Sequence, residues 1–172
     1  TVDLSSADLV LSKKSEQVSV LKEKINAVDF NQNKLDYILI DCPPSLNLLT
    51  INALVASDSV LVPLQAEFLP LEGLSQLMLS VKEIRDTANP NLRFEGIVLT
   101  MFDKRNNLSR QVEEDVRDNL KGLVYQSVIP RSVKLSEAPS YGKSIFDYSP
   151  RSKGAFAYKA LALEILSRHE VN

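Results

Sequence analysis

The apolar residues of this chain recur with two different periods. In residues 15–28 and 71–88 they lie three and four positions apart, which predicts amphipathic helices with one apolar face. Residues 35–41 and 59–64 are instead short apolar runs, typical of strands that are covered on both faces of a parallel sheet. The first half of the chain therefore reads as an alternation of helix and strand.

This alternation continues toward the C-terminus. The further elements that the pattern predicts are helices over 46–56, 108–121 and 154–168 and strands over 94–102 and 123–129. We expect Pro63, Pro90 and Gly122 to mark the ends of the elements that precede them. Between Pro130 and the last helix we expect an irregular stretch.

Regular alternation of strands and helices favours an α/β fold with a mostly parallel, twisted sheet and right-handed crossovers. No repeat, low-complexity segment or long linker divides the chain, so we expect a single domain over residues 1–172. Ligands of such sheets bind at the carboxyl ends of the strands. Candidate functional residues are therefore sought in segments 41–45, 65–71, 100–105 and 130–140.

Composition excludes several classes of protein. With 44% hydrophobic residues and a net charge of −2, the chain is neither intrinsically disordered nor fibrous. A single cysteine, no signal-peptide pattern and no unbroken apolar span lead us to expect a cytoplasmic protein with no membrane partner. Residues 129–172 carry 7 basic and 4 acidic side chains, against 13 and 18 before them. This basic segment is either a patch for an anionic partner or a solvated mixed-charge surface.

Asp41 is the first candidate for chemistry. Four apolar residues, Tyr37 to Ile40, precede it, so the predicted strand delivers a carboxylate to its own carboxyl end. This is the arrangement of a Walker B element, in which the carboxylate holds Mg²⁺ directly or through water. The alternative is a plain turn, because Asp is common where strands end.

Four segments, in order along the chain, resemble the ParA/Soj family. They are YILIDCPPSLNLLTINA over 37–53, DSVLVPLQAE over 58–67, GIVLTMFDKRNNL over 96–108 and IPRSVKLSEAPSYG over 129–142. Members of this family are deviant P-loop ATPases that segregate plasmids and chromosomes. The resemblance therefore implies a P-loop NTPase fold of the SIMIBI type, with ATP and Mg²⁺ as cofactors. It covers roughly residues 35–165 and favours the chromosomal Soj-like branch over the MinD and nitrogenase iron-protein branches.

The resemblance also implies roles for individual residues. Asp41 would be the catalytic carboxylate on the magnesium side, acting through water, and the residues after it would form switch II, namely Cys42, Pro43, Pro44 and Ser45. The purine side of the nucleotide would contact Thr100, Met101, Asp103, Pro130 and Arg131. DNA phosphates would contact Arg105, Arg131 and Lys134.

Each of these roles has a plainer alternative. Cys42 also suits a small buried residue, and the two prolines after it suit an ordinary turn before a helix. The nucleotide residues are equally consistent with structural loops, and each basic residue with a solvated surface charge. Lys134 stands where many relatives have Arg, which keeps the charge but loses bidentate geometry. We expect His169 to be exposed and without a role.

One motif of the family does not occur in the sequence. The deviant P-loop needs a lysine and closely spaced glycines around a phosphate, whereas the 5 glycines of this chain lie far apart, at positions 73, 96, 122, 142 and 154. The chain also starts with Thr1 rather than Met. We expect that it lacks about a third of a family member, that by itself it cannot hydrolyse ATP, and that unpaired strand edges make it self-associate.

For the intact protein the resemblance implies a complete cycle. It would bind ATP and Mg²⁺, form a homodimer, bind nucleoid DNA without reading its sequence, and hydrolyse ATP when a ParB-like partner stimulates it. Two alternatives stay open: a non-enzymatic relative that retains DNA or partner binding, and a MinD-like regulatory ATPase at the membrane. Residues 168–172 are poor material for a membrane anchor, which disfavours the second alternative.

Overall fold

The computed structural model describes residues 18–28, 35–43, 45–67 and 70–170. The chain divides into two compact units, residues 1–60 with 76–94 and residues 61–75 with 95–172. Among the described residues, helices and strands alternate, as the sequence predicts, only over residues 48–119; two helices come before the first strand, and only helical elements follow the second.

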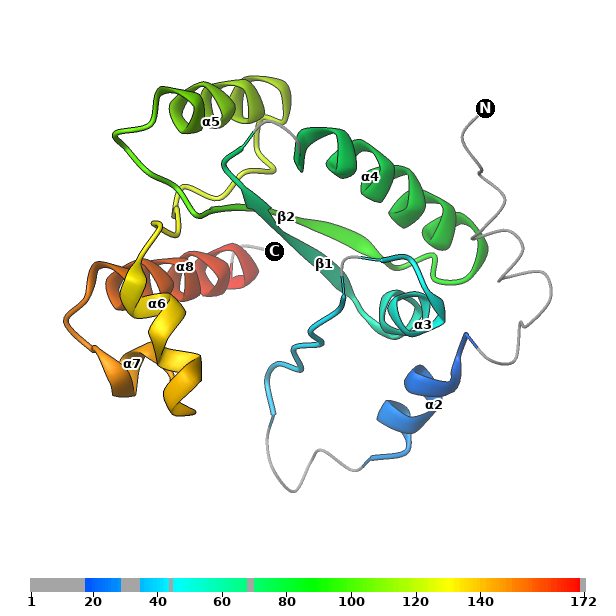
Figure 1. Cartoon of the computed structure of the whole chain (residues 1–172). Helices are drawn as coiled ribbons and strands as arrows, with labels where there is room; N and C mark the ends of the chain where they lie inside the picture. The colour runs from blue at the N-terminus through cyan, green and yellow to red at the C-terminus, as the bar shows by residue number, and fades with distance from the viewer. Residues whose placement is uncertain (1–17, 29–34, 44, 68–69, 171–172) are drawn as a thin grey trace. The chain divides into compact units, whose positions relative to one another are not determined.

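Strands β1 (Ser59–Gln65) and β2 (Arg93–Thr100) form a two-stranded sheet, in which Figure 1 shows them side by side. At one end the Arg93 amide donates to the Asp58 carbonyl, and at the other the Ala66 amide donates to the Thr100 carbonyl, both at 3.0 Å. The two strands advance in the same direction between these bonds, so the sheet is parallel. This confirms the predicted fold class.

Strand β1 continues past Pro63, so the prediction that Pro63 ends it is wrong. The carbonyl of residue 58 and the amide of residue 66 face β2, and backbone groups alternate sides along a strand. Pro63, an odd position, therefore faces the other edge of β1, where its missing N–H breaks no bond to β2.

Residues 123–131 run beside the other edge of β2 but do not form the continuous strand predicted over 123–129. Parallel bridges join Ile97 to Val124 and Phe102 to Pro130. The amides of Tyr125 and Ile129 still donate to the Ile97 and Leu99 carbonyls of β2. Between them the amides of Gln126 and Ser127 donate to the Glu164 carboxylate at 2.7 and 2.8 Å, so a side chain from a distant helix accepts two amides that make no bond to β2.

Gly96 allows this segment to approach β2. Its φ of +149° suits glycine, and a Cβ at this position would lie 2.6 Å from the Leu123 carbonyl oxygen and 2.8 Å from the Tyr125 ring. Any larger residue would push residues 123–125 away from the strand.

The first unit contains helices α2 (Val20–Asn26) and α3 (Leu48–Ala56) and most of α4 (Pro70–Thr87). Its core consists of apolar side chains from these helices and their flanks: Val18, Ile51, Leu54, Val55, Val81, Ile84 and Leu92. The three predicted helices are confirmed, although α2 and α3 begin later than expected. Helix α4 ends before Pro90, as predicted. There the side-chain amide of the buried Asn89 donates to the backbone carbonyls of Leu54 and Ser57.

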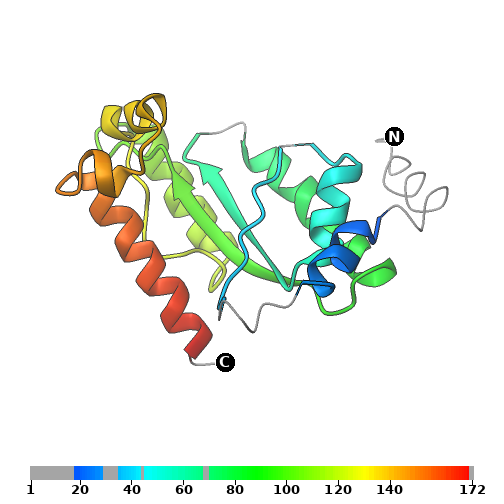
Figure 2. The ribbon, with the colours of Figure 1, turned by 90° about the horizontal axis from the view of Figure 1, so that it is seen from below.

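The second unit contains the remaining helices: α5 (Asn107–Asn119), α6 (Val133–Glu137), η3 (Ala138–Tyr141), α7 (Ile145–Tyr148) and α8 (Lys153–Glu170). Helices α5 and α8 confirm the prediction, but the stretch expected to be irregular forms three short helices. Figure 2 shows the short yellow and orange helices at the N-terminal end of the long red α8. Val98, Tyr125, Ile129 and Leu161 form the core between α8 and the strand region.

The expected stop at Gly122 is only approximately right. Helix α5 ends at Asn119, before the glycine, and Gly122 occupies the following turn with a φ of +82°.

Candidate functional site

Residues 35–41, the predicted buried strand that ends at Asp41, pair with no strand among the described residues. Their apolar side chains are open to solvent: Leu39 is 92% exposed and Leu35 54%. The strand prediction is therefore wrong for this structure. A strand exists only where a neighbour accepts and donates its backbone bonds, and the described part of the chain offers this segment no such neighbour. Asp41 consequently lies on an exposed segment.

The predicted switch residues follow Asp41 and lead into α3. Cys42, Pro43 and Ser45 are exposed, so the interpretation of Cys42 as a buried residue is wrong, and Pro44 lies outside the described residues. Partial burial raises the pKa of the Cys42 thiol, and the neighbouring Asp41 carboxylate raises it further.

Asn47 and Thr50 fix the turn between this segment and the helix. The Asn47 side chain accepts hydrogen bonds from the amides of Leu49 and Thr50, which caps α3. The Thr50 hydroxyl donates to the Ser45 carbonyl at 2.6 Å. Ser45 is thereby tied to the first turn of α3.

The two loops predicted to hold the nucleotide lie next to each other in the second unit. The Phe102 amide donates to the Ile129 carbonyl at 3.1 Å, and the Arg131 amide donates to the Phe102 carbonyl at 3.0 Å. These bonds bring Thr100, Met101 and Asp103 beside Pro130 and Arg131. All five predicted residues thus belong to one edge, at the carboxyl end of β2.

Met101 has a left-handed backbone, with a φ of +53°. This conformation costs a residue with a Cβ roughly 1–2 kcal/mol, and such outliers concentrate at functional sites. The bonds on either side, from Ala66 to Thr100 and between Phe102 and the residues around Pro130, hold the loop in this shape. The strain therefore supports a functional interpretation of this loop.

Asp103 and Arg105 form a forked ion pair in the same loop. The Arg105 side chain donates through Nε to Oδ1 at 3.1 Å and through Nη2 to Oδ2 at 3.0 Å, while its backbone amide also donates to Oδ1 at 3.0 Å. The side-chain hydrogen bonds from Arg105 and then its backbone amide lower the pKa of Asp103 from 3.8 to about 2. The carboxylate is therefore ionised and occupied by Arg105.

A second pair joins Lys134 to Glu137 on α6. The Lys134 ammonium lies 3.0 Å from Glu137 Oε2, which also accepts the Tyr148 hydroxyl at 2.9 Å. The same ammonium stands over the Tyr148 ring, 5.5 Å from its centroid. The hydrogen bond from Lys134, followed by that from Tyr148, lowers the pKa of Glu137.

Arg131 differs from the other two residues predicted to bind DNA. It is exposed, and within the described residues it belongs to no ion pair. Arg105 and Lys134 are each paired with a carboxylate, whereas the exposed Lys104 and Arg131 form no ion pair with any described residue.

Comparison with known proteins identifies the family of this chain. A family model described as an AAA domain matches residues 1–94. The chromosome partitioning protein ParA of Caulobacter vibrioides is 48% identical over 166 residues, which cover 96% of this chain and 62% of that protein. The sporulation initiation inhibitor protein Soj of Bacillus subtilis is 50% identical over 165 residues, covering 96% and 64%. The chain belongs to the ParA/Soj family.

This ParA/Soj chain spans between 62% and 64% of the length of these two relatives. A solved structure, cobyrinic acid a,c-diamide synthase from Mycobacterium smegmatis with bound ADP and magnesium, is 34% identical, with a TM-score of 0.68 over 95% of this chain and 59% of that one. The predicted parallel α/β fold is thereby confirmed, and a protein that shares it binds a nucleotide with magnesium.

Asp41 is the residue that the sequence predicts to contact Mg²⁺. No three His, Cys, Asp or Glu side chains gather into a possible metal site within residues 18–170 as far as the structure describes them. Mg²⁺ commonly takes only one or two carboxylates and completes its shell with phosphate and water. A single exposed carboxylate such as Asp41 therefore suits this ion in the presence of a nucleotide.

The structure also shows interactions that sequence reasoning missed. His169 was expected to have no role, but its Nε2 lies 3.0 Å from Glu95 Oε1. The same oxygen accepts a hydrogen bond from the hydroxyl of the buried Tyr125 at 2.9 Å. Arg168 stacks over the Tyr125 ring at 3.8 Å. These contacts attach the end of α8 to β2, and no local pattern in the sequence indicates them.

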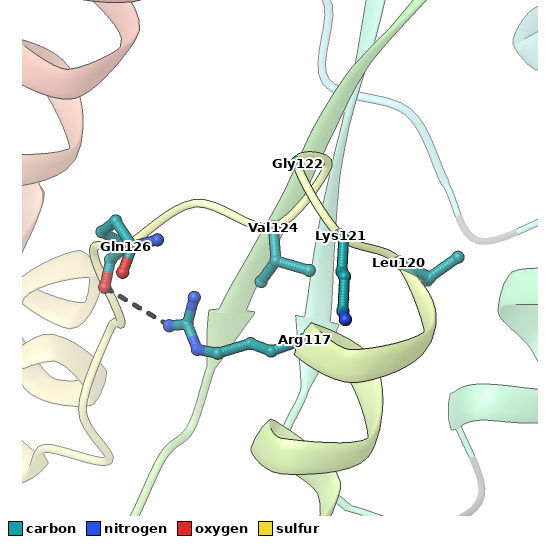
Figure 3. A pocket seen from close by; sticks show the side chains of 6 residues that line it. All are labelled: Arg117, Leu120, Lys121, Gly122, Val124 and Gln126. Carbon is teal, nitrogen blue, oxygen red and sulfur yellow. Dashed lines mark hydrogen bonds between the residues drawn. The ribbon is translucent and has the colours of Figure 1, made fainter.

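Figure 3 shows a depression that lies apart from the predicted nucleotide loops. Six residues line it: Arg117, Leu120, Lys121, Gly122, Val124 and Gln126. Arg117 donates to the carbonyls of Tyr125 and Gln126. The depression lies where residues 123–125 begin, which is the amino end of this parallel segment, whereas ligands of parallel sheets bind at carboxyl ends. We therefore interpret it as structural.

No helix within the described part of the chain is both long and apolar enough to cross a bilayer.

Proposed function

We propose that the natural protein containing this chain is an ATP hydrolase that acts in chromosome or plasmid partitioning. The observation that carries the proposal is the 48% and 50% identity, over 96% of this chain, to relatives named for chromosome partitioning and for inhibiting sporulation initiation. Residues 1–172 would belong to a single ParA-type ATPase domain of that protein.

The nucleotide would be held by the edge at the end of β2. Thr100, Met101 and Asp103 on one loop and Pro130 and Arg131 on the other would contact its purine side, and their adjacency supports this assignment. Asp41 would hold Mg²⁺ through water, and Cys42 to Ser45 would report the state of the nucleotide to α3. Bound Mg²⁺ supplies charge neutralisation for the phosphates.

DNA would be bound through Arg105, Arg131 and Lys134. Arg105 and Arg131 lie on loops and Lys134 on α6, and their exposed positions suit contacts with a phosphate backbone, which give affinity without base recognition. The remainder of the proposed cycle is an ATP-dependent homodimer on nucleoid DNA in the cytoplasm, whose hydrolysis a ParB-like partner stimulates.

The test compares the complete natural protein with the 172-residue chain. We expect Mg²⁺-dependent ATP hydrolysis from the complete protein and none from the chain by itself. In the complete protein, Asp41→Ala should lower the rate by about 10- to 100-fold, the usual cost of losing an outer-shell metal contact, whereas Asp118→Asn on α5 should leave it unchanged. A complete protein that ignores ATP but binds DNA would instead be a non-enzymatic relative, and binding to anionic lipid vesicles would indicate a MinD-like regulator.

A further inference from the structure

The Asp103–Arg105 and Lys134–Glu137 ion pairs in the predicted DNA-binding region have the same arrangement. In each, a cation expected to contact phosphate is held by a carboxylate two or three positions away: Arg105 by Asp103 at 3.0 Å and Lys134 by Glu137 at 3.0 Å. A phosphate oxygen and a carboxylate oxygen are equivalent acceptors for these groups. Each carboxylate therefore occupies the position that a DNA phosphate would take.

Both carboxylates are anchored independently of the cation side chains. Asp103 Oδ1 also accepts the backbone amide of Arg105, and Glu137 Oε2 also accepts the hydroxyl of Tyr148. The cations are freer, since the Arg105 side chain is 91% exposed and the Lys134 side chain 53%. When a pair opens, the cation would move from the carboxylate to a DNA phosphate, and the carboxylate would keep its other hydrogen-bond donor. Neither charge would then be left without a partner.

We propose that Asp103 and Glu137 are intramolecular competitors of DNA phosphate, which hold Arg105 and Lys134 and thereby weaken DNA binding. The proposal rests on the proposed DNA-binding function. It assigns an autoinhibitory role to two acidic residues among basic ones, and it leaves Lys104 and Arg131, which form no ion pair among the described residues, as the cations available for the first contact with DNA.

The size of the effect follows from the exposure of the pairs. In an exposed ion pair, the paired arrangement is favoured over the separated one by about fivefold or less. A phosphate backbone can therefore displace each carboxylate, and removing a carboxylate should raise DNA affinity by a factor of about three to five. Because the freed cation then releases a counterion, the slope of log affinity against log salt should steepen by up to about 1 for each pair.

The experiment measures binding of the complete natural protein, with ATP, to a fluorescent DNA duplex of mixed sequence at several salt concentrations. Asp103→Asn and Glu137→Gln remove the charge but keep an oxygen for the Arg105 amide and the Tyr148 hydroxyl. Each should bind DNA about three- to fivefold more tightly at low salt. Glu137 lies outside the predicted nucleotide loop, so its variant separates DNA affinity from any effect on ATP.

Two controls make the result specific. Asp118→Asn on α5 changes the net charge equally, but Asp118 forms no ion pair in the part of the chain that the structure describes, so this variant should bind like the wild type. In an Arg105→Ala background, Asp103→Asn should have no further effect, and Glu137→Gln should have none in a Lys134→Ala background. Non-additivity of this kind shows that each carboxylate acts through its own cation.

Four results would overturn the inference. If the wild type and both variants bind DNA with equal affinity, the inference is wrong although DNA binding itself stands. The same holds if Asp118→Asn raises DNA affinity as much as the two variants do. Weaker binding of the variants would mean that the carboxylates position the cations for phosphate rather than compete for them. If neither wild type nor variants bind DNA, the DNA-binding part of the proposed function fails and the inference fails with it.

Discussion

Asp103 is the residue whose chemistry the fold changes most clearly. Arg105, only two positions away, surrounds its carboxylate with two side-chain donors and one amide. The spacing of the two residues is visible in the sequence, but many such neighbours point apart. The turn after β2 makes the difference, because it directs the Arg105 amide and side chain to the same carboxylate.

We predict that the Asp103 carboxyl titrates at a pH of about 2 in the folded chain. The pKa of Asp103 is lower in the folded chain than its ordinary value of 3.8, so the ion pair stabilises the folded chain fully at pH values above 3.8. This stabilisation is lost as the pH falls from 3.8 through about 2. Carbon-detected NMR of the side-chain carboxyl measures this directly. Arg105→Ala should return the midpoint toward 3.8, and Lys104→Ala should leave it unchanged. A midpoint near 3.8 in the wild-type chain would contradict the ion pair.

At the scale of elements, helix α8 supplies hydrogen-bond acceptors for backbone amides that make no bond within the sheet. Glu164 accepts the amides of Gln126 and Ser127 and pairs with Arg168 at 3.1 Å. Burial would raise the pKa of Glu164, but the two amides and Arg168 outweigh it, so the pKa is lowered. The interruption after Tyr125 is therefore stabilised by a helix rather than left unsatisfied.

We predict that Glu164→Ala lowers the free energy of unfolding by about 2 kcal/mol, the usual value for hydrogen bonds to a charged group. Urea denaturation followed by circular dichroism measures the change. Glu170→Ala, at the exposed end of the same helix, is the matched control and should change stability by less than about 0.5 kcal/mol. Equal effects of the two substitutions would show that the Gln126 and Ser127 amides need no partner from α8.

At the scale of the whole molecule, the segment before Asp41 is the exception to an otherwise consistent fold. Its apolar residues have the composition of a buried strand, yet Leu39 is 92% exposed and Ile38 48%. Exposed apolar segments with unpaired backbone groups favour association with another chain.

We predict that the 172-residue chain self-associates, with a weight-average mass in analytical ultracentrifugation well above its monomer mass of 19.2 kDa. Leu39→Lys should shift the chain toward the monomer, because a charge in this segment opposes strand pairing. Leu163→Lys on α8, where the leucine is 57% exposed, is the control and should leave the association unchanged. A monodisperse wild-type monomer would contradict this prediction.

Much of the fold could be predicted from the sequence, and the failures have a common cause. Helices α4, α5 and α8 follow from periodicity, because a helix satisfies its own backbone and needs only one apolar face. The strand predictions fail where a distant partner decides: residues 35–41 pair with no strand in the part of the chain that the structure describes, and the amides of Gln126 and Ser127 donate to Glu164. A strand's hydrogen bonds are made with residues far away in sequence, and periodicity carries no information about them.

The candidate site divides in the same way. The sequence by itself determined the family motifs and the order of strands and loops, and hence that Thr100 to Asp103 and Pro130 to Arg131 follow the ends of strands. The Asp103–Arg105 and Lys134–Glu137 pairs join near neighbours in sequence, and the local turn and helix bring their side chains together. Only the tertiary structure decided that the two loops touch and that Glu164 accepts the amides of Gln126 and Ser127. The physical reason is range: local propensity and pattern specify which element forms, whereas these contacts are specified by where distant parts of the chain meet.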